Sequence, residues 1–118
     1  MKLVHHKNLT LERWKALSFA EQMANVGSEV YRTLNWRSKK REYSETAFER
    51  ALELLDLIIE AASGRGPRLR ELARVREALV DYFVYDNSYG STDDLWRKYF
   101  DTFHRAAKIQ VAHRTNHA

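Results

Sequence analysis

The chain contains no cysteine among its 118 residues. This absence excludes disulfide bonds, thiolate zinc sites and cysteine nucleophiles together. The chain also has a single proline and only four glycines, so few positions favour turns. We therefore expect most residues to lie in long regular elements of one domain, residues 1–118.

Long apolar runs are absent as well. No stretch approaches the roughly 20 apolar residues that cross a bilayer, and the opening MKLVHHKNLTLERW lacks the apolar segment of a signal peptide. We expect a cytoplasmic protein that does not contact membranes. The 20 Lys and Arg against 16 Asp and Glu give a net charge of +4 at pH 7, a mild preference for anionic partners.

Apolar residues recur with the period of an α-helix and predict four helices, near residues 18–36, 44–62, 67–85 and 92–112. Ser18 and Glu21 have the spacing of a capping box, and Ser44 is the expected cap of the second helix. Short links favour antiparallel neighbours, so the expected fold is an all-α antiparallel four-helix bundle. A short amphipathic extension, residues 9–17, should lay Trp14 over one end of the core.

Gly27 stands in the middle of the first predicted helix, where glycine costs about 1 kcal/mol relative to alanine. Together with Ala20 and Ala24 it forms a stripe of small residues on one helix face. Such a stripe lets a neighbouring helix approach closely. We interpret the stripe as a helix-packing surface, either within one bundle or against another subunit, and a ligand contact as the less favoured alternative.

Basic residues cluster in two places and predict contacts with the nucleic-acid backbone, RNA or DNA. One cluster lies in the link RSKKRE and the other, which also includes Arg65, lies at the start of the third predicted helix. The predicted phosphate-binding residues are Arg37, Lys39, Lys40, Arg41, Arg68, Arg70 and Arg74. Clustered cations bind nucleic acid by releasing its counterions, although a solvated loop is the plainer interpretation. In an up-down bundle the two links lie at opposite ends, so one chain need not join them into a single patch.

Aromatic residues fall at the predicted helix ends and links: Trp14, Trp36, Tyr43, Tyr85 and Tyr89. Aromatic side chains that stay exposed at such places can anchor a partner molecule. We expect some of these five rings to be exposed.

Few polar residues have the position or spacing expected of a catalytic or metal-binding site. Arg76 interrupts the apolar stripe of the third predicted helix, and Glu29 is its expected partner in a buried ion pair. His113 and His117 have a metal-ligand spacing but no carboxylate completes the set. The acidic stretch DNSYGSTDD leads to Arg97, where a calcium loop needs glutamate. We therefore expect neither a metal nor a cofactor.

The segment WRKYFDTFH places six residues between Arg97 and His104. This spacing resembles the R-x(4–6)-H motif of HEPN ribonucleases, which are small helical bundles. The resemblance implies a metal-independent RNase in which two subunits bring paired arginines and histidines to one cleft. If the step from Arg97 to His104 is taken as six positions, about 600° of helix, the two side chains lie about 120° apart around the helix axis.

Four blocks of sequence, EQMANVGSEVYR, FERALELLDL, RELARVREALVDYF and DNSYGSTDDLW, resemble a group of small helical proteins from microbial and metagenomic genomes. That resemblance covers residues 12–107, and the group has no established activity. By size, helical content and basic character, the chain also resembles Avd, the accessory proteins of diversity-generating retroelements. This second resemblance implies a four-helix bundle that assembles as a pentameric barrel and binds a reverse transcriptase and nucleic acid.

The leading hypothesis is a non-enzymatic helical bundle that self-associates. It would bind nucleic acid, or an enzyme that acts on nucleic acid such as a reverse transcriptase. The alternatives are a dimeric HEPN-type RNase that uses Arg97 and His104, and a plain protein–protein adaptor.

Overall fold

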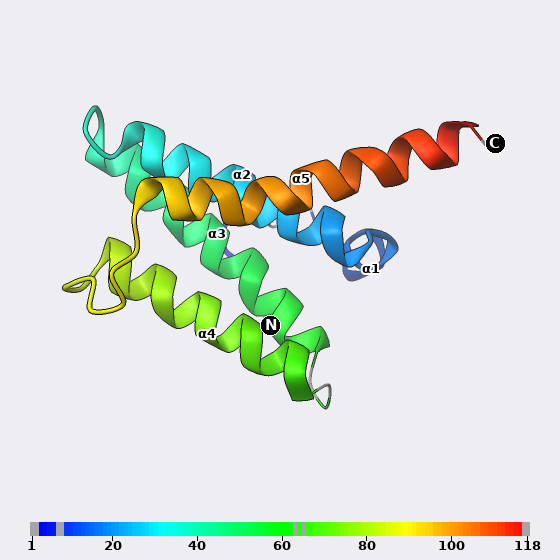
Figure 1. Ribbon diagram of the computed structural model, residues 1–118, viewed down its shortest axis with the longest axis horizontal. Coiled ribbons are helices and arrows are strands. Elements are labelled where there is room, and N and C mark those ends of the chain that lie inside the picture. The colour runs from blue at the N-terminus through cyan, green and yellow to red at the C-terminus, as the bar shows by residue number, and fades with distance from the viewer. Residues whose placement is uncertain (1–2, 7–8, 63, 65, 117–118) are drawn as a thin grey trace.

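The structure is a computed structural model that describes residues 3–6, 9–62, 64 and 66–116, with the backbone alone at residues 11, 115 and 116. Its five helices are α1 (Leu11–Ala16), α2 (Phe19–Trp36), α3 (Arg41–Ala61), α4 (Gly66–Phe83) and α5 (Asp93–Asn116). The expected all-α bundle with a short N-terminal helix is confirmed (Figure 1). Arg65 and His117, two positions of the sequence analysis, lie outside the described residues.

Helices α2 and α3 form the centre of the bundle. The link 37–40 turns the chain so that α3 runs antiparallel to α2, and α4 then turns back along α3 (Figure 1). Helix α5 runs back along α2, because Asp93 at its start pairs with Arg37 while Arg114 near its end pairs with Glu21. The last turns of α5 extend beyond the other helices.

One apolar core draws side chains from all five helices. Its most deeply buried members include Trp14, Met23, Val26, Val30, Leu55, Ile58, Leu72, Leu79 and Phe100. Burial of one such large apolar side chain stabilises the fold by about 1.5–3 kcal/mol. Trp14 is 3% exposed and lies over one end of this core, as the amphipathic pattern of residues 9–17 predicts.

Of the two predicted helix caps, the structure confirms one and contradicts the other. Ser18 Oγ accepts the Glu21 N–H and Glu21 Oε1 accepts the Ser18 N–H, each at 3.1 Å, so the predicted capping box is confirmed. Ser44 is not a cap, because α3 already begins at Arg41. The buried Ser44 hydroxyl instead donates to the Thr33 carbonyl of α2 at 2.8 Å. A hydroxyl that faces another helix is not available to the end of its own helix.

Helix α5 continues past its predicted end at residue 112. The Ser18 hydroxyl donates to Gln110 Oε1 at 2.6 Å, and Arg114 Nη2 donates to Glu21 Oε2 at 3.2 Å. These contacts hold the far half of α5 against the N-terminus of α2, which explains the extra turn.

The segment 4–6 lies against α3 and binds the carboxylate of Glu53. The backbone N–H groups of Val4, His5 and His6 donate to Glu53 at 3.0–3.1 Å, and His6 Nδ1 lies 3.0 Å from its Oε1. Burial raises the pKa of Glu53, but these hydrogen bonds outweigh burial and lower the pKa to about 2. The ionised Glu53 therefore fastens the start of the described chain to the bundle.

Candidate nucleic-acid interface

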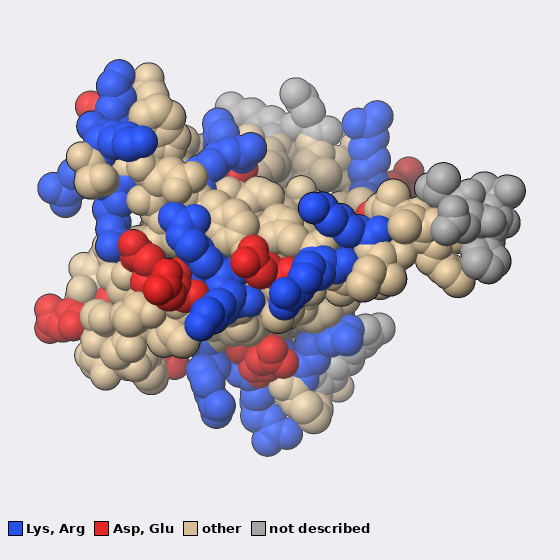
Figure 2. All heavy atoms as spheres, turned by 45° about the horizontal axis from the view of Figure 1, so that its top comes forward, with Lys and Arg blue, Asp and Glu red and all other residues tan. Residues whose placement is uncertain are grey.

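The predicted basic link forms a sharp corner between two long helices. We call residues 36–43 the α2–α3 corner. The N–H groups of Lys39 and Lys40 both donate to the carbonyl of Trp36, at 3.0 and 2.8 Å, which closes the last turn of α2 before α3 begins. This tight turn leaves Lys39, Lys40 and Arg41 exposed. Figure 2 shows Lys and Arg side chains gathered at the corner and along α5.

Two of the four cations at the corner have carboxylate partners. Arg37 pairs with Asp93 at 3.2 Å, and its guanidinium lies 5.1 Å from the centre of the Tyr82 ring. Arg37 therefore fastens α2 to the start of α5 and the end of α4. Arg41 pairs with Glu45 at 3.0 Å within α3.

The other two cations at the corner are not neutralised. Among the described residues, neither Lys39 nor Lys40 has a carboxylate within 4.0 Å. Lys40 Nζ lies 4.8 Å from the centre of the Tyr43 ring, an arrangement that favours a cation. These two lysines are the cations of the corner that remain available to an anion.

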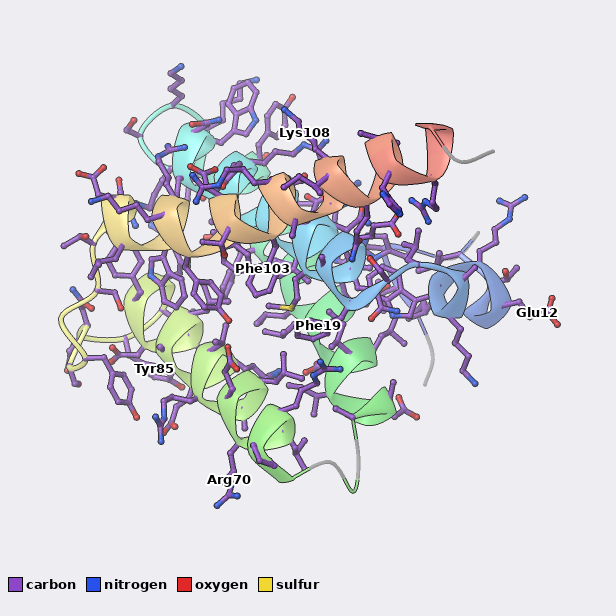
Figure 3. The ribbon with its side chains drawn as sticks, turned by 45° about the vertical axis from the view of Figure 1, so that its right-hand side comes forward. Glu12, Phe19, Arg70, Tyr85, Phe103 and Lys108 are labelled. Atoms are coloured by element: carbon purple, nitrogen blue, oxygen red, sulfur yellow. The ribbon has the colours of Figure 1, made fainter. Side chains whose placement is uncertain are left out.

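Two aromatic rings lie among these cations. Trp36 is 37% exposed and Tyr43 is 49% exposed, and their rings meet edge to face with centres 5.1 Å apart. Tyr85 and Tyr89, beyond α4, are exposed as well, and Tyr85 points outward (Figure 3). Trp14 is buried, because α1 folds onto the core, and the other four rings are the exposed ones.

The second basic cluster lies at the start of α4, at the other end of α3. A helix of 21 residues is about 30 Å long, so the structure does not bring the two clusters together. Arg68 packs on the Phe19 ring of α2 at 4.2 Å. Arg70 points outward (Figure 3), and Arg74 is exposed. All three described arginines of this cluster are exposed, and Arg68 is the one that lies over an aromatic ring.

The C-terminal helix adds cations that the sequence analysis missed. Lys98, Arg105 and Lys108 of α5 are exposed and have no carboxylate within 4.0 Å among the described residues. Lys98 and Arg105 are seven positions apart, about 700° of helix, so they share one face. That helical spacing was the available signal, but Asp93, Asp94 and Asp101 in the same helix make the segment look balanced in a linear count of charges.

Helix α5 leads from one basic cluster toward the other. It starts beside the α2–α3 corner through the pair between Arg37 and Asp93. Ten residues later, about 15 Å along the helix, Phe103 meets Phe19, the ring on which Arg68 lies (Figure 3). Arg97 and Lys98 of α5 therefore lie on the stretch of helix between these two contacts.

Arg97 and His104 also share a face of α5. The expected angle of about 120° is wrong, because the step between them is seven positions, about 700° of helix. Both side chains contact Tyr31 of α2. The Arg97 guanidinium lies 5.7 Å from the centre of this ring, and the His104 ring centre lies 5.2 Å from it. Arg97 Nη2 also donates to Asn35 Oδ1 at 3.1 Å.

The surroundings of His104 are tightly packed. Its Nε2 is buried without a hydrogen-bond partner among the described residues. The Tyr31 hydroxyl donates to the Asp101 carboxylate and lies 3.1 Å from the Arg97 carbonyl. Burial, reinforced by Asp101, raises the pKa of Tyr31. In this arrangement the His104 Nε2 is shielded from any substrate in solvent.

Helices α2 and α5 approach each other closely at Gly27. A Cβ atom at this position would lie 2.7 Å from Phe100 Cβ and 3.0 Å from His104 Nε2. Ala20 and Ala24, the other residues of the small stripe, are buried too. At Gly27 the neighbouring helix is therefore α5 of the same chain.

The expected ion pair between Arg76 and Glu29 is not formed. Arg76 donates to both oxygens of Asp56 in α3, at 2.6 and 3.3 Å, and Glu29 pairs with Arg32 at 2.6 Å. Arg76 is only partly buried, because α4 packs beside α3 rather than against α2. Its available carboxylate is therefore on α3.

Comparisons with models of known protein families, with curated proteins and with solved structures give no match for this chain. In the part of the chain that the structure describes, no helix is both long and apolar enough to cross a membrane. The same residues contain no group of three His, Asp or Glu side chains placed to hold a metal. The function of this protein is therefore inferred from the geometry of its own residues.

Proposed function

We propose that the protein binds single-stranded nucleic acid, without catalysis, through the α2–α3 corner. The observation that carries this proposal is the pair of half-exposed rings, Trp36 and Tyr43, beside the unpaired cations Lys39 and Lys40. Base stacking on aromatic side chains contributes about 1–3 kcal/mol per base. Lysines beside such rings bind the phosphates that connect the bases.

A single strand fits this corner better than a duplex. The bases of a duplex are stacked on one another and hidden from an exposed ring, whereas the bases of a single strand are available for stacking. Beyond the corner, Lys98 and Arg105 on α5 extend the cationic surface along about 10 Å of helix. The strand would thus stack at the corner and continue along α5.

The test is the affinity for a fluorescent single-stranded oligonucleotide, measured by anisotropy over a range of salt concentrations. Each phosphate contact contributes about 0.7 to the slope of log K against log salt for single strands. The double variant Lys39→Ala/Lys40→Ala should therefore lower that slope by about 1.4. Trp36→Leu should weaken binding about tenfold and leave the slope unchanged, because it removes stacking alone.

The matched control is the double variant Arg13→Ala/Arg50→Ala, which removes the same charge from exposed positions of α1 and α3. Its salt slope should stay at the wild-type value. An unchanged slope in the Lys39→Ala/Lys40→Ala variant would contradict the assignment of the corner. Equal losses in both double variants would show that net charge alone drives binding.

The resemblance to Avd accessory proteins adds two elements to this proposal: self-association and a reverse transcriptase as a protein partner. The all-α fold and the basic charge support that extension. Co-purification of the chain with a reverse transcriptase encoded beside its gene tests the partner. The Lys39→Ala/Lys40→Ala variant then separates contact through nucleic acid from direct protein contact, because only the former should be lost.

A metal-independent RNase of the HEPN type is the second candidate. The observation that favours it is the shared face of Arg97 and His104 and their common contact with Tyr31. The burial of His104 Nε2 against Gly27 counts against it, since an acid–base group must reach the ribose. The test is RNA cleavage in the presence of a chelator. Cleavage that disappears in His104→Ala supports this candidate, and cleavage that persists in that variant rejects His104 as the catalytic group.

A further inference from the structure

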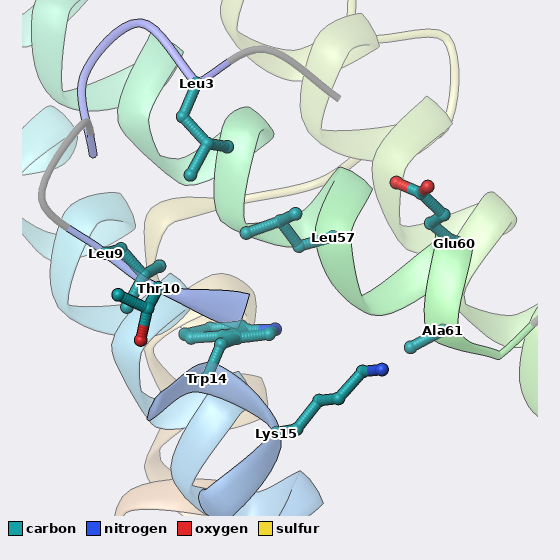
Figure 4. A pocket seen from close by; sticks show the side chains of 8 residues that line it. All are labelled: Leu3, Leu9, Thr10, Trp14, Lys15, Leu57, Glu60 and Ala61. Atoms are coloured by element: carbon teal, nitrogen blue, oxygen red, sulfur yellow. The ribbon is translucent and has the colours of Figure 1, made fainter. Parts of the chain in front are cut away.

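Two hollows on the surface differ in the charge of their walls. The pocket of about 380 Å³ beside α1 is mostly apolar, and Lys15 and Glu60 bring one charge of each sign to it (Figure 4). A groove of about 780 Å³ lies between α3, the second half of α4 and the loop after α4. Three carboxylates and one guanidinium line this groove, an excess of two negative charges in a chain of net charge +4: Asp56, Glu77, Asp81 and Arg76. Of the two hollows, the groove is the one whose charge favours a partner of one sign, a cation.

This groove, which we call the α3–α4 groove, combines apolar, aromatic and acidic side chains. Ile59 and Val80 supply apolar wall, and Tyr85 and Tyr89 of the loop are 72% and 56% exposed beside them. Among the described residues, Glu77 has no Lys, Arg or His nitrogen within 4.0 Å. A hydrogen bond to Glu77 raises the pKa of Tyr89, so ring and carboxylate lie together. The face of an aromatic ring also attracts a cation, so both kinds of side chain favour a positively charged partner.

The loop that carries the two tyrosines is ordered by its own hydrogen bonds. Asp81 is buried, and its carboxylate accepts the N–H of Ser88 at 2.9 Å and the N–H of Tyr89 at 3.1 Å. The Asn87 side chain donates to the Ser91 carbonyl at 2.9 Å and accepts the Ser91 N–H at 2.8 Å. A partner therefore meets a preformed rim, which reduces the entropy lost on binding.

The end of α5 has the properties that the groove lacks. Ile109 is 69% exposed, and Lys108 is exposed without a carboxylate within 4.0 Å among the described residues. Both lie about 100° or more around the helix from Gln110 and Arg114, which contact the start of α2. The last turns of α5 extend past the other helices (Figure 1). An apolar side chain and a free cation are thus presented together at a projecting end of the molecule.

The groove and the end of α5 cannot meet within one chain. Tyr89 precedes the start of α5, whereas Ile109 lies sixteen residues after Asp93, about 24 Å along the helix. In Figure 1 the loop after α4 and the C-terminal end lie on opposite sides of the molecule. A contact between these two surfaces therefore joins two molecules head to tail, and it covers both surfaces at once.

We propose that the α3–α4 groove binds the end of α5 of a second copy of this chain. Ile109 of the second copy packs on Ile59 and Val80, and its Lys108 ammonium lies beside Glu77 and the tyrosine rings. Such a contact is heterologous, so successive copies form a closed ring or an open filament. The inference rests on the self-association in the proposed function, to which it gives two surfaces, and it does not depend on nucleic-acid binding at the α2–α3 corner.

The test is the mass of the full chain, freed of tag and nucleic acid, by light scattering after gel filtration at several protein concentrations and low salt. The wild-type mass should exceed that of a monomer, and Glu77→Lys and Lys108→Glu should each weaken association about tenfold or more. The double variant Glu77→Lys/Lys108→Glu should recover association, because it forms the same pair with exchanged charges and has the wild-type net charge. A wild-type chain that stays monomeric at every concentration, or a double variant no better than the single ones, would overturn the proposal.

Matched variants separate the contact from a general effect of charge. Glu12→Lys and Arg13→Glu make the same changes in net charge at exposed positions of α1 and should leave the mass as in wild type. Losses in these controls equal to those in the groove variants would reject the groove. Ile109→Ser removes the apolar contact, so it should weaken association about tenfold while the unfolding midpoint is retained. Undiminished association in Ile109→Ser would reject the end of α5 as the occupant.

The failure of this proposal and the failure of the nucleic-acid proposal give different results. The Lys39→Ala/Lys40→Ala variant should self-associate as the wild-type chain does, because the α2–α3 corner contributes nothing to the contact. Self-association without oligonucleotide binding would reject the corner and keep the groove. Oligonucleotide binding by a chain that is monomeric at every concentration would reject the groove and keep the corner.

Discussion

At the scale of single residues, Gly27 sets the distance between α2 and α5. Phe100 packs so closely against this position that an added methyl group would lie 2.7 Å from Phe100 Cβ. That atom is attached directly to the backbone of α5, so it moves only if the helix moves. The helix cost of glycine is thus offset by the close packing of two helices.

Replacement of Gly27 by alanine should therefore destabilise the fold even though alanine is the better helix former. Overpacking costs about 1–3 kcal/mol and the gain in helix propensity is about 1 kcal/mol, so we expect a net loss of up to about 2 kcal/mol in urea unfolding. Gly66→Ala is the control, because its added methyl group would meet only ordinary contact, 3.6 Å from Arg70. A Gly27→Ala chain more stable than wild type would contradict the close contact.

Glu53 makes the stability of the fold depend on acid. Its pKa is lowered from the ordinary 4.5 to about 2 by hydrogen bonds from the segment 4–6. Its contribution should be complete above about pH 4.5 and should disappear as the pH falls toward 2, because protonation removes the charge that those N–H groups bind. Glu53→Gln should lose about 1–3 kcal/mol at pH 7.

The pH dependence of this loss is the measurement that isolates Glu53. The difference in unfolding free energy between wild type and Glu53→Gln should shrink as the pH is lowered from about 4.5 toward 2. A difference that stays constant over that range would show that the variant acts through altered packing and not through the carboxylate charge.

At the scale of elements, the start of α2 is joined to the far half of α5. Ser18 caps α2, and its hydroxyl also donates to Gln110 near the end of α5. The capping partner Glu21 is the acceptor for Arg114, and the pKa of Glu21 is lowered by the Ser18 N–H first and by Arg114 second. One helix terminus therefore stabilises its own helix and the far half of another.

Loss of this cap should affect both helices. Ser18→Ala should lower the unfolding free energy by about 0.5–2 kcal/mol, the usual range for an N-cap. Hydrogen exchange should increase in the last turns of α5 as well as in the first turn of α2. Ser18→Thr keeps the hydroxyl and should behave nearly as wild type. Faster exchange in α2 alone would show that the bond to Gln110 contributes nothing.

The helices were predictable because their apolar residues repeat with the helical period, and the Ser18–Glu21 box because capping is local in sequence. Two of the errors have a common cause, since each involves a side chain that found a partner on another helix. Ser44 donates to α2 instead of capping α3, and Arg76 pairs with Asp56. The order of residues along the chain does not show which helix supplies the partner of a given side chain.

The candidate interface was predictable only in part, for the same reason. The cations of the α2–α3 corner are contiguous in sequence, but the burial of Trp14 and the exposure of Trp36 and Tyr43 depend on how the helices pack. The pairing of Arg37 with Asp93 likewise joins residues from two distant segments.

At the scale of the whole molecule, acidic groups of α3 are bound within the chain while several basic groups at the corner and along α5 are not. Acidic groups of α3 are engaged within the chain, Glu53 by the segment 4–6 and Asp56 by Arg76. Five basic groups at the corner and along α5 have no carboxylate partner among the described residues: Lys39, Lys40, Lys98, Arg105 and Lys108. A net charge of +4 therefore understates how cationic one face of the molecule is.

The assembly state is the prediction that belongs to this scale. Light scattering after gel filtration, at low and high salt, should give an oligomer if the protein self-associates as proposed. A salt-resistant pentamer favours the Avd-like function, and a dimer favours the HEPN-type alternative. A monomer under both conditions would remove self-association from the proposal. Gly27→Ala should leave the mass unchanged, because its contact is with α5 of the same chain.

The fastening of the segment 4–6 to α3 also decides how the protein should be handled in the laboratory. His5 and His6 are bound to Glu49 and Glu53, so a polyhistidine tag fused ahead of them places competing imidazoles beside the same carboxylates. The end of α5, by contrast, extends past the other helices after its contacts at Gln110 and Arg114 (Figure 1). Affinity tags and fluorescent labels therefore belong after α5, where they leave the Glu53 contacts undisturbed.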